Sequence, residues 1–121
     1  MSAPYSLAPS SPLLALSAAT TGTGGVLQIH GRCHMLTVSL ESAGTTSGGV
    51  VTIEEARFDP AVLAGLDYTG TWSTILAVNA SDFTGTAQKS IHVFGSFWAV
   101  RTRISSTITG GGTVSSWIWA N

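Results

Sequence analysis

The residue types best suited to binding a metal ion lie together at His30, Cys33 and His34. Imidazole and thiolate groups a few residues apart can bind zinc, but a structural zinc site usually needs four such ligands. His92 is the only other histidine or cysteine in the sequence, and no Cys-x-x-Cys pair is present. His30 and Cys33 would also lie on opposite faces of an unbroken strand. We therefore expect no metal site and no cofactor.

Residues that could catalyse a reaction are present, but not in a catalytic arrangement. The serines and histidines form no Gly-x-Ser-x-Gly motif. Glu54 and Glu55 are adjacent, so on a strand they point to opposite faces and cannot act as the paired carboxylates of a glycosidase. We interpret them as rim charges, one of them paired with Arg57. The glycines at 110–112 lack the Lys-Ser/Thr of a phosphate-binding loop. We expect no catalytic residues, and an enzyme is only the third of our hypotheses.

The composition describes a single, weakly charged domain. The chain has 121 residues, of which 44% are hydrophobic and 9% charged, with a formal net charge of −1. The five basic residues are balanced by six acidic ones, which argues against a nucleic-acid partner. Cys33 is the only cysteine, so it can form no intrachain disulfide. A surface with so little charge repulsion favours a protein that works in an assembly.

No segment of the sequence has the pattern of a membrane or export signal. No apolar run approaches the roughly 20 residues that a membrane-spanning helix needs. Residues 13–19 (LLALSAA) superficially resemble a signal peptide, but no basic residue precedes them and their apolar run is short. We expect neither export nor a membrane partner.

From residue 26 onward, apolar and polar residues alternate between clusters of Gly, Ser, Asn and Asp, which predicts strands. The expected strands are 26–31, 34–41, 49–57, 72–79, 87–94, 97–105 and 113–119. The predicted fold is all-β: an antiparallel β-sandwich, jelly-roll-like, of about seven to eight strands. We expect a hairpin loop at 42–48, connections at 81–85 and 109–112, and a helical turn at 59–65 that Asp59 caps.

Residues 1–25 have a different composition, with three prolines followed by the glycine-rich run TTGTGG. Such residues disfavour helix interiors and central strands. We therefore divide the chain into an extended N-terminal arm, 1–25, and a β-sandwich domain, 26–121. The arm is either a disordered tail or a segment whose Leu13, Leu14 and Leu16 dock on a neighbour or on the parent domain.

The last two strands carry the candidate interface residues. In the last strand, Trp117 and Trp119 lie on the face opposite Ile118, so both faces carry large apolar groups. Either the same subunit covers the tryptophan face, or it is an intersubunit contact, where Trp is enriched. In the preceding strand, Arg101 and Arg103 share a face. They either face solvent or clamp a partner's carboxylates.

Two segments resemble a known group of proteins. Residues 97–105 (FWAVRTRIS) form an aromatic-Val-Arg-x-Arg strand, and residues 107–114 (TITGGGTV) follow it with a Thr/Gly-rich turn that leads into a final alternating strand. Residues 68–75 (YTGTWSTI) look like an Asp-Gly-Thr-Trp hairpin in which Thr69 replaces the Asp. In both features the chain resembles small β-sandwich virion proteins of tailed bacteriophages.

This resemblance implies a capsid decoration, or cement, protein that binds the major capsid protein on the outer capsid surface and stabilises contacts between subunits. It would be made in the host cytoplasm and act in the virion as a homo-oligomer, expected to be a trimer. The alternative is a tail-fibre or baseplate module whose exposed Trp72, Trp117 or Trp119 stacks on a host-surface glycan. The expected interface residues are Leu13, Leu14, Leu16, Arg101, Arg103, Trp117 and Trp119.

Overall fold

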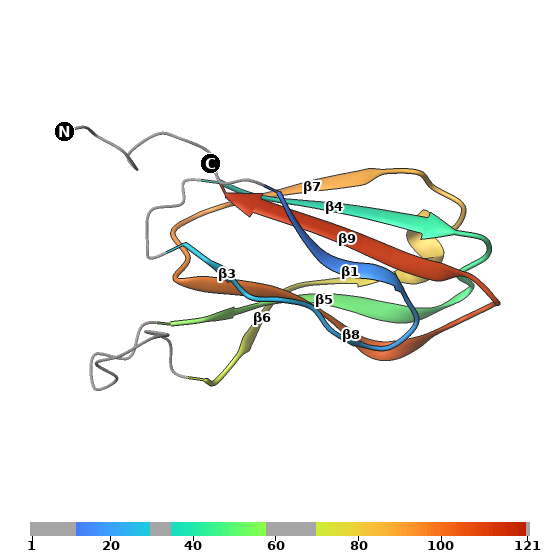
Figure 1. Cartoon of the computed structure of the whole chain (residues 1–121), viewed down its shortest axis with the longest axis horizontal. Coiled ribbons are helices and arrows are strands. Elements are labelled where there is room, and N and C mark those ends of the chain that lie inside the picture. The colour runs from blue at the N-terminus through green and yellow to red at the C-terminus, as the bar shows by residue number, and fades with distance from the viewer. Residues whose placement is uncertain (1–11, 30–34, 58–69, 121) are drawn as a thin grey trace.

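Two antiparallel sheets packed face to face make up the described part of the chain (Figure 1). The computed structural model describes residues 12–29, 35–57 and 70–120. Sheet A contains, in spatial order, β1 (Leu13–Ala19), β9 (Thr113–Ala120), β4 (Met35–Ala43) and β7 (Lys89–Phe94). Sheet B contains β2 (Gly22–Thr23), β8 (Ala99–Thr109), β5 (Gly48–Ala56) and β6 (Ser73–Asn79), and β3 (Leu27–Gln28) also pairs with β8.

The order of the strands is that of a jelly roll. Strands from the two halves of the chain pair antiparallel: β1 with β9, β2 and β3 with β8, β4 with β7, and β5 with β6. When β2 and β3 are counted as one interrupted strand, this gives eight strands wound as in jelly-roll domains. The predicted all-β, jelly-roll-like sandwich is therefore confirmed.

The core lies between the sheets and is built from alternate residues of each strand. On β9, for example, Val114, Ser116 and Ile118 are fully buried, whereas the residues between them are half-exposed. This period-2 pattern is the one that predicted the strands from residue 26 onward, because successive side chains of a strand point to opposite faces. Strands occur at all seven expected positions, but within 26–31 only Leu27–Gln28 pairs, and residues 30, 31 and 34 of the expected strands lie outside the described residues.

The sandwich begins earlier in the chain than residue 26. Residues 13–19 form β1, which pairs with β9, and Leu16 is buried in the core. Residues 22–23 and 27–28 then cross to sheet B and pair with β8. The boundary at residue 25 thus falls inside the sandwich; residues 1–11 lie outside the described residues. β1 escapes the strand prediction because its two register shifts against β9 break the period-2 alternation, and β2 because it contains only a glycine and a threonine.

The connection at 42–48 is not a hairpin, as the sequence suggested, because it crosses from sheet A to sheet B. β4 pairs with β7 and β9, whereas β5 pairs with β6 and β8. The connection at 109–112 also crosses between the sheets, and the two loops bind each other. Gly112 N donates to Thr45 O at 2.7 Å, and Ser47 N donates to Thr109 O at 2.9 Å. Turn residues indicate a reversal, but not which strands the reversal joins.

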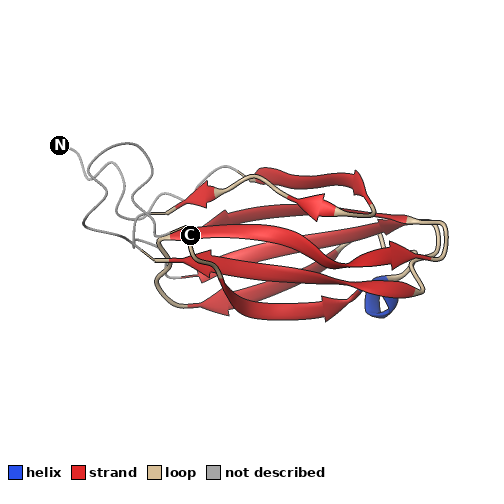
Figure 2. Ribbon diagram, turned by 90° about the horizontal axis from the view of Figure 1, so that it is seen from below, coloured by secondary structure: helices blue, strands red, loops and turns tan. Residues whose placement is uncertain are grey.

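The connection expected at 81–85 is confirmed, and it includes the short 3-10 helix η1 (Ala80–Phe83). Figure 2 shows η1 at the end of the sandwich away from the C-terminal end of β9. Within the described ranges, no helix is long and apolar enough to span a membrane. The helical turn expected at 59–65 lies outside the described residues.

One polar contact joins the two sheets through the core. Thr102 Oγ1 of β8 lies 3.2 Å from Ser116 Oγ of β9, and both residues are fully buried. Each hydroxyl group is therefore the hydrogen-bond partner of the other, at a position that is inaccessible to water.

This contact predicts a non-additive pair of substitutions. Thr102→Val or Ser116→Ala alone leaves one buried hydroxyl unpaired and should lower the free energy of unfolding by about 1–3 kcal/mol. The double variant removes both polar groups and should be more stable than the sum of the single effects predicts. Urea unfolding of the four proteins measures this. Strictly additive losses would show that the hydroxyls do not depend on each other.

Candidate functional site

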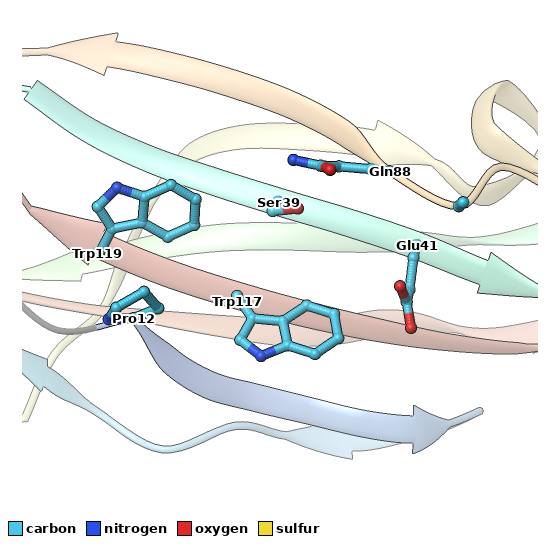
Figure 3. A pocket seen from close by; sticks show the side chains of 7 residues that line it. Pro12, Ser39, Glu41, Gln88, Trp117 and Trp119 are labelled. Carbon is cyan, nitrogen blue, oxygen red and sulfur yellow. The ribbon is translucent and has the colours of Figure 1, made fainter.

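The outer face of sheet A carries a shallow aromatic groove of about 380 Å³. Its aromatic residues are Trp117 and Trp119, which alternate along β9 with the core residue Ile118. Both indoles are half-exposed and lie on the same side of the sheet (Figure 3). The other lining residues are Pro12, Ser39, Glu41, Ala87 and Gln88.

Small side chains on the neighbouring strand make room for the indoles. In the register of β9 with β4, Trp117 stands opposite Ser39 and Trp119 opposite Thr37. These hydroxyl residues point away from the core, yet they are only 7% and 3% exposed. Thr37 Oγ1 lies 3.0 Å from His92 Nδ1, so it has a partner on β7. The groove floor is therefore a packed surface, although it faces outward.

Polar groups border the aromatic surface on the side of β4 and β7. Glu41 is the only charged residue among those that line the groove in the described structure. Gln88 lies just before β7, and its Nε2 donates to Ser90 Oγ at 3.2 Å. Flat apolar rings beside a carboxylate and an amide suit a ligand that has an apolar face and hydroxyl or amide groups at its edge.

Of the three leucines predicted as interface residues, one belongs to this face. Leu14 stands opposite Trp117 in the register of β1 with β9 and is 47% exposed. Leu16 is 5% exposed and lies in the core, and the half-buried Leu13 packs against it. The structure thus places Leu13 and Leu16 on their own domain, one of the two docking alternatives that the sequence left open.

The two predicted arginines do share a face, but it is the outer face of sheet B. Arg101 Nε donates to Glu54 Oε1 at 2.8 Å, and Arg103 Nη1 donates to Glu54 Oε2 at 3.4 Å. The clamped carboxylate thus belongs to the same chain. Glu54 is only 6% exposed, so its interpretation as a rim charge is wrong. The expected interface residues therefore do not form one surface.

Trp72 contributes to this same cluster on sheet B. The Arg101 guanidinium lies 4.2 Å from the centroid of the Trp72 ring, a cation–π contact. Of the three tryptophans considered for stacking, Trp72 therefore already stacks with a residue of its own chain. Trp117 and Trp119, in contrast, line one groove together.

Only one of the four residues considered for zinc, His92, lies in the described part of the chain. His30, Cys33 and His34 lie outside the described residues, while His92 is on β7 beside Thr37. Among the residues that the structure describes, no three His, Cys, Asp or Glu side chains gather as metal ligands do.

Sequence reasoning did not find the polar border of the groove. Glu41 and Ser39 alternate with core residues on a strand that was predicted correctly, and this pattern marks them as outward-facing. Nothing in the sequence shows that β9 lies beside β4, however, so their pairing with the tryptophans was not predictable. No local sequence pattern identifies Gln88 as a residue of the groove.

The Glu54 cluster predicts a charge-dependent contribution to stability. Glu54→Gln removes the carboxylate from two arginines and should lower the free energy of unfolding by about 1–3 kcal/mol, measured by urea denaturation. Glu55→Gln is the matched control, because Glu55 is the next residue of β5 and is half-exposed. Its effect should stay within about 0.5 kcal/mol. Equal losses in the two variants would contradict a specific role of Glu54.

Comparisons with known proteins give no family assignment. No protein-family model matches the chain, and no curated protein matches it in sequence. Among solved structures, the chain is similar to the SPBc2 prophage-derived protein YomS, with 12% sequence identity and a TM-score of 0.49. The match covers 94% of this chain and 96% of YomS.

Proposed function

We propose that this chain is a structural virion protein of a tailed bacteriophage, which decorates the outer capsid surface as an oligomer and stabilises contacts between capsid subunits. The observation that carries the proposal is the aromatic outer face of sheet A. There Trp117, Trp119 and Leu14 are all partly exposed side by side. The sequence resemblance of residues 68–75 and 97–114 supports the placement in a phage particle.

The chemistry of this face suits a protein partner. Interface cores are rich in tryptophan and poor in charged residues, and the groove has two tryptophans and one carboxylate. Truncating a central tryptophan of an interface often costs about 2 kcal/mol or more. The partner surface would need an apolar pocket for the indoles and a hydrogen-bond donor for Glu41. A decoration protein of this kind carries out no reaction.

Attachment in several copies would make a modest contact sufficient. Linked binding events raise the overall affinity by roughly 10²–10⁴ when the geometry allows them to occur together. A capsid presents its subunits at fixed spacing, so an oligomer can engage several of them at once. The low charge of this protein, with 9% charged residues, also keeps repulsion between neighbouring copies small.

A second candidate function is saccharide binding, favoured by the polar border of the groove. A sugar ring has an apolar face of C–H groups and a rim of hydroxyls. Trp117 and Trp119 offer flat surfaces for the first, and Glu41 and Gln88 offer an acceptor and an amide for the second. The two tryptophans are two residues apart on a strand, so their Cα atoms are about 6–7 Å apart. That spacing suits adjacent rings of a short glycan.

The decoration function predicts that binding to capsids depends on the tryptophan face. The double variant Trp117→Ala/Trp119→Ala should bind undecorated capsids at least about 30-fold more weakly, since about 2 kcal/mol is lost. Co-sedimentation across a concentration series measures the midpoint. Thr74→Ala, exposed on β6 in the other sheet, is the control and should bind as the wild type does. An unchanged midpoint in a folded double variant would refute this role of the face.

The saccharide function predicts a different effect of the same face. Short oligosaccharides should quench or shift the tryptophan fluorescence of the wild type, and Trp119→Ala and Glu41→Gln should each weaken that binding about 10-fold or more. Capsid binding of Glu41→Gln, measured in parallel, separates the two functions. Absence of any saccharide response across a broad oligosaccharide panel would reject the second candidate and leave the first untouched.

A further inference from the structure

Sheet A ends in an edge strand that is unusually regular. β7 contains six residues and pairs with β4 without a register shift, from Met35 opposite Phe94 to Leu40 opposite Lys89. In the described part of the chain, β7 pairs with no other strand. Figure 1 shows it at the upper border of the sheet. Its outer backbone groups are thus arranged to accept another strand.

The other sheet edges are irregular or short. β1 has two register shifts against β9, and β6 has one against β5. β2 and β3 are two residues each. Bulges and short strands are common ways in which proteins prevent edge-to-edge pairing. β7 has no bulge and no proline, and its only charged residue is Lys89 at its first position.

Apolar side chains accompany this open edge. Ile91 and Val93 are only half-buried where they pack against the core, and Phe94 at the end of the strand is 80% exposed. A further strand placed beside β7 would cover all three. The edge therefore combines backbone groups that can pair with apolar groups that gain from being covered.

We propose that β7 pairs antiparallel with β7 of a second copy about a twofold axis, which joins the two sheets A into one continuous sheet. A strand pairs with itself most readily in this way, because a twofold axis makes the same patch serve both partners. The proposal goes beyond the decoration function and does not depend on it.

Side-chain alternation restricts the register of this pair. A twofold axis perpendicular to the sheet keeps the core faces of both copies on the same side. Residues directly opposite each other must then point to the same face. The axis must therefore lie between one residue and the same residue of the second copy, so that this residue stands opposite itself. With the axis at His92, Ile91 stands opposite the partner's Val93, and Phe94 stands opposite the partner's Ser90. This register covers the apolar groups and leaves Lys89 outside the paired segment.

The same symmetry has a consequence for the aromatic groove. Because the axis is perpendicular to the sheet, the outer faces of both copies of sheet A point in the same direction. Trp117 and Trp119 of both copies would then face one common surface. The dimer would therefore present two grooves together, and any partner with repeated sites could engage both.

The oligomeric state tests the proposal. Sedimentation velocity from about 1 to 300 µM should show reversible association to twice the chain mass of 12.4 kDa. His92→Lys places like charges directly opposite each other at the axis, so it should shift the protein to monomer. Thr74→Lys, exposed on the β6 edge, is the matched control and should dimerise as the wild type does. A wild-type monomer or trimer, or a His92→Lys protein that remains dimeric, would overturn the proposal.

Cross-linking tests the register independently of charge. In a Cys33→Ser background, His92→Cys should form an intermolecular disulfide under mild oxidation, because directly opposite residues of paired strands have Cβ atoms about 4.5–5.5 Å apart. Ala77→Cys, exposed on the β6 edge, should cross-link far more slowly. Equal rates for the two cysteines would show random collision and reject the β7 pair, even if each variant is well folded.

Discussion

The central position of β9 in sheet A is the constraint on which the rest of the structure depends. β9 has β1 on one side and β4 on the other, so its inward residues Val114 and Ile118 are completely buried. Its alternate residues must then point outward, and there they are Trp117 and Trp119. The strand that closes the core therefore also builds the aromatic groove. Both surfaces therefore depend on the position of the same strand.

Several hydrogen bonds inside this weakly charged chain are made by the hydroxyl groups of Thr and Ser. Thr46 is fully buried; its Oγ1 donates to Ala80 O at 3.0 Å and lies 3.1 Å from Ser42 Oγ, which joins the loops at one end of the sandwich. Thr102 and Ser116 join the sheets in the same way. Neutral hydroxyls satisfy buried backbone groups at little desolvation cost. Because the chain has few charged residues, the edge strand β7 carries one lysine, Lys89, to disfavour pairing with another strand.

The sequence predicts local features of this protein better than long-range ones. Alternation predicts the strands from residue 26 onward and the inward face of β9, because it depends on neighbouring residues alone. It does not show that the connection at 42–48 changes sheets, or that Glu54 lies beside Arg101 across 47 positions of the chain. The groove is of this second kind, since Trp117 meets Ser39 only through the pairing of β9 with β4. β1 was missed for a different reason: its register shifts break the alternation.

The groove and the β7 edge belong to the same sheet, and this links the two proposals physically. A shallow groove buries little of a ligand, so one copy gains only a limited binding free energy from two half-exposed indoles. A twofold pair through β7 places two such grooves in one plane at a fixed separation, without a linker whose ordering would oppose binding. Rigid pairing of this kind favours partners that repeat their binding sites, as a capsid surface or a polymeric glycan does. A single isolated site would gain nothing from the dimer, so dependence of binding on both sites is the physical signature of this arrangement.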